Sequence, residues 1–124
     1  MKIFIDDQAY TDRDGWVPKN WRRAVNFEEF KNLLEEAQKE GETIEAVSFD
    51  NDLGEGEKEG WEILQWLSEN HPEMFRPEVS LEVHSANSEA AVRMRGKIKF
   101  WREHVDELIE AKERPDPWAE LKVK

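Results

Sequence analysis

Three short apolar runs along the chain each end abruptly in polar residues. They cover residues 2–5, 44–49 and 79–83, and carboxylates, a histidine or a serine follow at once. A short apolar run bounded by turn residues is typical of a buried strand in a parallel sheet. We therefore predict three buried strands, together with a shorter strand over residues 21–25.

Longer stretches between these runs repeat their apolar residues every three or four positions and predict helices. The first helix follows Asn26, a predicted N-cap with Glu29 at the capping-box position, and ends at Gly41. A second helix begins at Trp61 and ends near residue 70. Residues 88–112 form one long helix or two halves that meet at Gly96. Helices alternating with strands indicate a three-layer α/β fold.

Length, charge and cysteine content limit the class of protein. The 124 residues suit one domain over the whole chain, and residues 118–123 could add a weak edge strand. The net charge of −11 argues against broad, charge-driven binding to nucleic acid or to an anionic membrane. No apolar run is long enough to span a bilayer, and there is no cysteine, so we expect a cytoplasmic protein without disulfides.

Carboxylates follow two of the predicted strands. Asp6 and Asp7 come after the first strand, and Asp50 and Asp52 come after the strand at 44–49. In open α/β sheets, ligands bind outside the carboxyl ends of the strands. Asp6, Asp7 and Asp50 would there supply the oxygen ligands that Mg²⁺ prefers. The alternative is that each aspartate is a turn former or a helix cap.

The strand at 79–83 is followed by a second group of polar side chains. His84 is a candidate general acid or base for a phosphate ester, or else a hydrogen-bonded structural histidine. Ser85 and Asn87 are candidates for orienting phosphate oxygens or for capping the next helix. Arg93 is the best candidate for binding phosphate within a basic run at 93–102, whose other members we expect on a solvated helix face or a partner-binding surface. The six tryptophans are expected mostly in the core.

Five motifs together resemble one known family. IFIDD at 3–7, GW at 15–16, VSFDNDLG at 47–54, GWEILQWL at 60–67 and VHSAN at 83–87 resemble the cyclic-phosphate-processing receiver-like domains. They resemble, more distantly, the receiver domains of response regulators. The resemblance covers roughly residues 2–100, and the combination is far more specific than any single motif. It implies a flavodoxin-like, mainly parallel sheet with strand order 2-1-3-4, possibly extended by a fifth strand.

The resemblance also implies roles for individual residues. Asp6 and Asp7 correspond to the acidic pair of receivers, and Asp50 corresponds to the phosphoacceptor. Asp52 would give a backbone carbonyl to Mg²⁺, and Ser85 corresponds to the receiver Ser/Thr. The receiver lysine that follows the fifth strand has no clear counterpart, and a loop at 8–20 replaces the usual first crossover helix.

Two functions therefore stay open. The first is a small Mg²⁺- or Mn²⁺-dependent phosphate-handling domain that processes cyclic phosphates or RNA-end phosphates, as the resemblance implies. The second is a non-catalytic receiver-like interaction or signalling module with a protein partner. Affinity for Mg²⁺ separates them, because a pure interaction module has no need of the cation.

Overall fold

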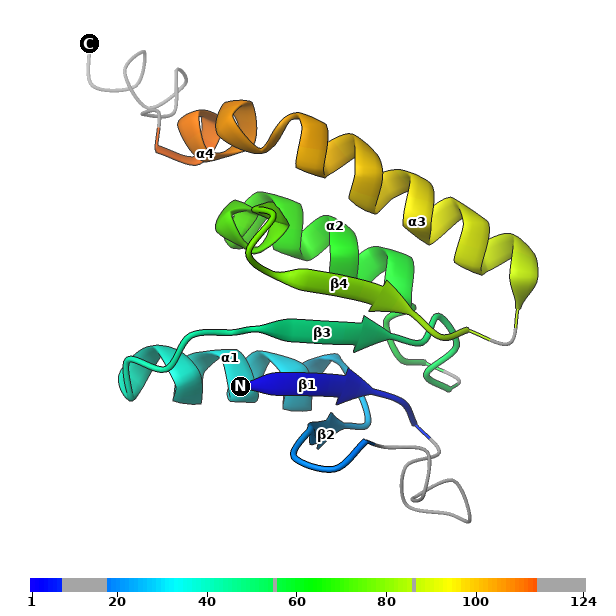
Figure 1. Cartoon of the computed structure of the whole chain (residues 1–124). Helices are drawn as coiled ribbons and strands as arrows, with labels where there is room; N and C mark the ends of the chain where they lie inside the picture. Colours follow the sequence, from blue (N-terminus) through cyan, green and yellow to red (C-terminus); the bar gives the residue numbers. More distant parts are fainter. Residues whose placement is uncertain (8–17, 55, 86, 114–124) are drawn as a thin grey trace, which may run out of the picture.

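A sheet of four parallel strands forms the centre of the protein, and the computed structural model describes residues 1–7, 18–54, 56–85 and 87–113. The strands are β1 (Lys2–Ile5), β2 (Arg22–Ala24), β3 (Ala46–Phe49) and β4 (Ser80–Val83), in the spatial order β2-β1-β3-β4 (Figure 1). This confirms the receiver-like α/β class and the predicted strand order. The predicted edge strand at 118–123 and most of the 8–20 loop lie outside the described residues.

Helix α1 (Phe27–Lys39) begins and ends where the sequence predicts. The Asn26 side chain accepts a hydrogen bond from the Glu29 N–H at 2.9 Å, as an N-cap should. The Glu29 carboxylate accepts from the N–H of Val25 at 3.1 Å, one residue before the cap. At the other end Gly41 has a φ of +67°, the left-handed conformation that glycine adopts at little cost.

The remaining helices correct one prediction. Helix α2 (Gly60–Asn70) is followed by the short 3₁₀ helix η2 (Pro72–Phe75). The last helical region breaks at His104 into α3 (Ser88–Glu103) and α4 (Val105–Glu113), so the proposed break at Gly96 is wrong.

The position of the break has a local physical reason. Gly96 is an exposed position inside α3, where glycine costs only about 1 kcal/mol relative to alanine and does not stop a helix. At His104 the backbone N–H instead bonds the carbonyl of Trp101, three residues back, at 3.2 Å. This tighter turn ends α3 and lets α4 pack against η2 and α2.

The main hydrophobic core lies between the helices and one face of the sheet. Ile3, Ile5, Val47 and Phe49 are fully buried there, and the ring of Phe49 contacts Phe30 of α1 at a centroid distance of 6.2 Å. Alternate strand residues point to the opposite face. In the described part of the chain, no helix has the length and apolar character needed to cross a membrane.

Candidate active site

The register of the sheet brings three polar side chains to one level. Strands β1, β3 and β4 pair through their last residues, so the residues that follow are also adjacent. The Asp50 N–H donates to the Ile5 carbonyl at 3.1 Å, and the His84 N–H donates to the Phe49 carbonyl at 2.9 Å. As a result, ligand atoms of Asp6, Asp50 and His84 all lie within 4.8 Å of one another.

The two carboxylates of this group are buried. Asp6 is 1% exposed and Asp50 is 8% exposed. Burial, followed by the negative charge of Asp6, raises the pKa of Asp50 from 3.8 to about 6, and the charge of Asp7 adds to the effect. Hydrogen bonds from the backbone of Asn51 and Asp52 oppose this rise in pKa. Two buried carboxylates this close favour a proton or a cation between them.

The imidazole of His84 is held on three sides. Its ring stacks on Phe4 with centroids 4.1 Å apart, and its Nδ1 lies 2.7 Å from the Ser48 hydroxyl oxygen. Its Nε2 lies 3.5 Å from Oδ2 of Asp6. The sequence analysis missed Phe4 and Ser48. The signal was available, because Phe4 stands two residues before Asp6, and Ser48 stands two residues before Asp50, which places them on the same face of the sheet.

The donor set at this edge fits a hard divalent cation. Mg²⁺ is commonly held by one or two carboxylates together with waters and substrate phosphate, and Asp6 and Asp50 supply two carboxylates at adjacent strand ends. Imidazole is better suited to softer metals, so beside Mg²⁺ the ring of His84 stays available for proton transfer.

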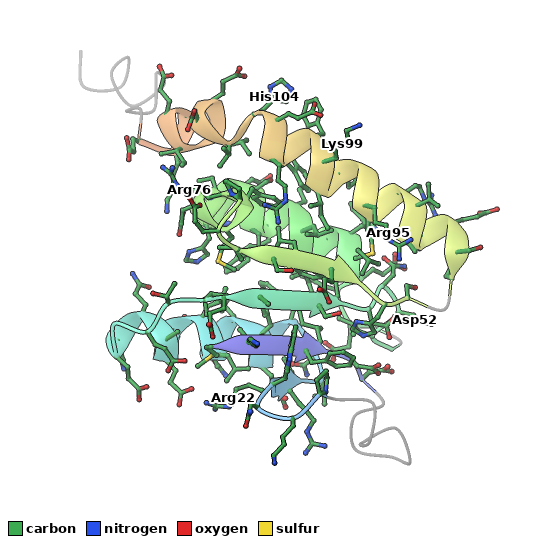
Figure 2. All side chains as sticks on the ribbon, viewed as in Figure 1. Arg22, Asp52, Arg76, Arg95, Lys99 and His104 are labelled. Atoms are coloured by element: carbon green, nitrogen blue, oxygen red, sulfur yellow. The ribbon has the colours of Figure 1, made fainter. Side chains whose placement is uncertain are left out.

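The other two predicted metal residues lie beside this group. Asp7 is half-buried, and its charge contributes to the raised pKa of Asp50, so it lies close to the site. Asp52 is exposed near the carboxyl ends of the strands (Figure 2), and its side chain accepts a hydrogen bond from the Gly54 N–H at 3.3 Å. The metal-binding roles of both residues stay predictions.

Ser85 and Asn87 connect β4 to α3. The Asn87 side chain accepts a hydrogen bond from the Ala90 N–H at 3.1 Å and caps α3. The Ser85 hydroxyl accepts from the Asn87 N–H at 3.1 Å. Both side chains therefore act at the start of the helix, the second of the two roles considered from the sequence, while phosphate binding stays a prediction.

The basic run on α3 divides into two sets. Arg95 donates to the Val83 carbonyl at 3.1 Å, and Arg102 donates to the carbonyls of Phe75, Arg76 and Val79. These hydrogen bonds attach α3 to the backbone of neighbouring elements, while Arg95 is also exposed, as expected for a solvated helix face. Arg93 instead lines a cavity beside the carboxylate cluster, together with Asn51, Glu59, Trp61, Ala90 and Lys97.

Comparison with known families agrees with this geometry. The family model of the cyclic-phosphate processing receiver domain matches residues 1–100. The chain belongs to this family. No curated protein and no solved structure matches the chain. The match of the cyclic-phosphate processing receiver domain runs from β1 into α3, so all candidate site residues lie within it.

Proposed function

We propose that this receiver-like domain is a metal-dependent phosphoesterase that opens cyclic phosphates. The observation that carries the proposal is the convergence of Asp6, Asp50 and His84, whose ligand atoms lie within 4.8 Å of one another at the carboxyl edge of the sheet. An acidic pair next to an imidazole can support metal-assisted hydrolysis, with the carboxylates as metal ligands and the imidazole as the group that transfers a proton. Membership of the cyclic-phosphate processing family supports the substrate class.

Each residue of the cluster has a distinct role in this proposal. Asp6 and Asp50 would hold Mg²⁺ or Mn²⁺, which when bound would offset the negative charge of the phosphoryl oxygens. Water adds to phosphorus, one ring P–O bond breaks, and the cyclic diester becomes a phosphomonoester. His84 would take the proton from water or give one to the departing oxygen. The Asp6 carboxylate, 3.5 Å from Nε2, would stabilise the positive charge of the protonated ring.

The test offers nucleoside 2′,3′-cyclic phosphates and short RNAs with cyclic phosphate ends to the protein with Mg²⁺ or Mn²⁺. We expect phosphomonoester formation that Asp50→Asn abolishes and that His84→Ala reduces roughly 100-fold or more. His71→Ala is the matched control, because His71 contacts Glu73 and Trp66 outside the cluster. Equal loss in both histidine variants would argue against a catalytic role for His84.

A second measurement separates hydrolysis from phosphorelay signalling. Receivers keep an aspartyl phosphate with the help of a lysine that has no clear counterpart in this sequence, so acetyl phosphate should label Asp50 weakly or not at all. Durable labelling of Asp50 would instead favour a signalling receiver. If the protein neither hydrolyses cyclic phosphates nor binds Mg²⁺, the non-catalytic interaction module is the better explanation.

A further inference from the structure

A cavity of about 340 Å³ adjoins the candidate active site between the start of α2 and the first turns of α3. It shares a wall with the carboxylate cluster, because Asn51, which lines it, directly follows Asp50. The Gly60 N–H donates to the Asn51 carbonyl at 2.8 Å, which fixes the start of α2 against this wall. A group bound in the cavity would therefore lie beside the residue that follows Asp50 in the chain.

The Asn51 side chain offers this cavity a hydrogen-bond donor. Asn51 is only 8% exposed, and its Oδ1 accepts a hydrogen bond from the Trp61 backbone N–H at 3.3 Å. Within the described residues, no hydrogen bond is made by the other half of this amide, Nδ2, and this atom is not among the fully buried ones that lack a partner. Nδ2 is therefore open to solvent, and it can donate a hydrogen bond to an acceptor supplied by a ligand.

Two cations of α3 line the same cavity. Arg93 and Lys97 stand one helical turn apart. The Lys97 ammonium lies 5.9 Å from the ring centroid of Trp61 and 5.4 Å from that of Trp101, so the two aromatic rings position it. Across residues 1–7, 18–54, 56–85 and 87–113, neither cation forms an ion pair.

One carboxylate also lines the cavity, but it is already engaged. Glu59 accepts a hydrogen bond from the indole Nε1–H of Trp61 at 2.7 Å and caps the start of α2. Arg93, Lys97 and Glu59 together give the cavity a net charge of +1, in a chain whose net charge is −11. The positive end of the α2 dipole at the same place adds to the attraction for an anion.

We propose that this cavity binds a second phosphate group of the substrate, held by Lys97, Arg93 and the Asn51 amide. The proposal rests on the proposed function, since the reacting cyclic phosphate would occupy the adjoining carboxylate cluster. The volume of about 340 Å³ lies at the lower end of the range for ligand pockets and exceeds the need of one phosphate, so part of the attached sugar also fits. The substrate class is therefore a cyclic phosphate that carries a separate terminal phosphate.

The first experiment compares two substrates that differ by one phosphate: adenosine 2′,3′-cyclic phosphate and the same compound with a 5′-phosphate. The added phosphate should raise kcat/KM by about tenfold or more in the wild-type protein. Lys97→Gln should bring the ratio of the two kcat/KM values close to one. Lys99→Gln should keep the wild-type ratio, because Lys99 points away from the sheet (Figure 2). Equal kcat/KM values for the two compounds in the wild-type protein would overturn the proposal.

The second experiment needs no catalysis. Adenosine 5′-monophosphate is titrated into nitrogen-15-labelled protein while the NMR signal of the Trp61 indole N–H, assigned by its loss in Trp61→Phe, is followed. The signal should shift in the wild-type protein and in Asp50→Asn, but not in Lys97→Gln. This result without any hydrolysis would leave the cavity assigned and refute the proposed function. A Trp61 signal that never shifts at millimolar ligand would refute the cavity assignment, whatever the activity.

Discussion

The imidazole ring of His84 lies nearly parallel to the ring of Phe4, with centroids 4.1 Å apart and an angle of 11° between the planes. Phe4 stands two residues before Asp6 in the same strand, β1. A single strand therefore supplies both the buried carboxylate and the aromatic surface that orients the imidazole. The spacing between the carboxylate and the imidazole is set by the sheet itself, because each of the two residues directly follows a paired strand.

Ser48→Ala tests whether this orientation matters. The substitution removes the hydroxyl that lies 2.7 Å from Nδ1 of His84, so we expect a loss of about 1–2 kcal/mol in the free energy of unfolding. In an active enzyme, kcat should fall more than KM rises, because the imidazole loses its orientation. Urea denaturation and steady-state kinetics measure the two effects. Ser80→Ala is the control, since its exposed hydroxyl makes a long hydrogen bond of 3.5 Å to Glu82, and equal effects of the two substitutions would contradict this role of Ser48.

The raised pKa of Asp50 predicts a pH-dependent stability without metal. Because the pKa is about 6 in the folded protein and 3.8 as an ordinary value, the folded state binds more protons in this range, and stability falls as the pH rises through it. In EDTA, Asp50→Asn should therefore exceed the wild-type protein in stability at about pH 8, by at most about 3 kcal/mol. The advantage should vanish near pH 4. Urea denaturation at several pH values measures it.

Asp52→Asn is the control for this pH dependence, because Asp52 is exposed and its removal relieves no buried charge. Its stability should follow that of the wild-type protein at every pH. An Asp50→Asn advantage that is the same near pH 4 and about pH 8 would show that charge repulsion is not its cause.

A bound divalent cation should offset the repulsion between the buried carboxylates and so stabilise the folded protein. Mg²⁺ or Mn²⁺ should raise the Tm of the wild-type protein, since a ligand at about 100 times its Kd adds about 2.7 kcal/mol to the stability of the folded state. Asp6→Asn and Asp50→Asn should remove most of this gain. Asp52→Asn should keep it, because the ligand expected from that residue is a backbone carbonyl. The absence of any shift in Tm with either metal up to tens of millimolar would argue strongly against a metal site.

The location of the carboxylate cluster could be predicted from the sequence because it depends on local patterns. Apolar runs define the strands, and parallel strands bring their carboxyl ends to one edge of the sheet. That reasoning placed Asp6, Asp50 and His84 together, as the structure does. The N-cap at Asn26 and the glycine end of α1 were predictable for the same reason, since each is determined within a few residues.

The cavity beside the cluster could not be predicted in this way. Trp61 was expected in the core, yet it is 38% exposed and lines the cavity with Lys97, which is far away in the sequence. Their contact depends on how α2 packs against α3, and neither helix shows this in its own pattern. The break at His104 likewise could not be predicted, because it depends on a tight turn whose backbone N–H bonds the Trp101 carbonyl and after which α4 packs on η2. The sequence pattern marked only Gly96 as a place where the helix could divide.

Two glycines provide a final test of how the site is built. Gly60 begins α2 against the backbone of the carboxylate cluster, and a Cβ there would clash with the Asp50 carbonyl oxygen, come within 2.9 Å of the Asn51 Cα and lie 2.7 Å from the Met94 Cε. Two of these three atoms belong to the backbone and cannot move aside cheaply. Gly60→Ala should therefore destabilise the protein by about 1–3 kcal/mol and weaken Mg²⁺ binding, because relieving the clash moves Asp50.

Gly96→Ala is the matched control for Gly60→Ala. Among the described residues, the same methyl group at Gly96 would meet nothing within 4 Å beyond the backbone of its own helix, α3. Gly96→Ala should raise the free energy of unfolding by about 0.5–1 kcal/mol, because alanine favours the helix. The substitution should leave the Mg²⁺-dependent rise in Tm unchanged. Urea denaturation and thermal melts with and without Mg²⁺ measure both substitutions. If Gly60→Ala were as stable as the wild-type protein, α2 could not be packed on the Asp50 backbone, and this backbone would not form a rigid wall between the carboxylate cluster and the cavity.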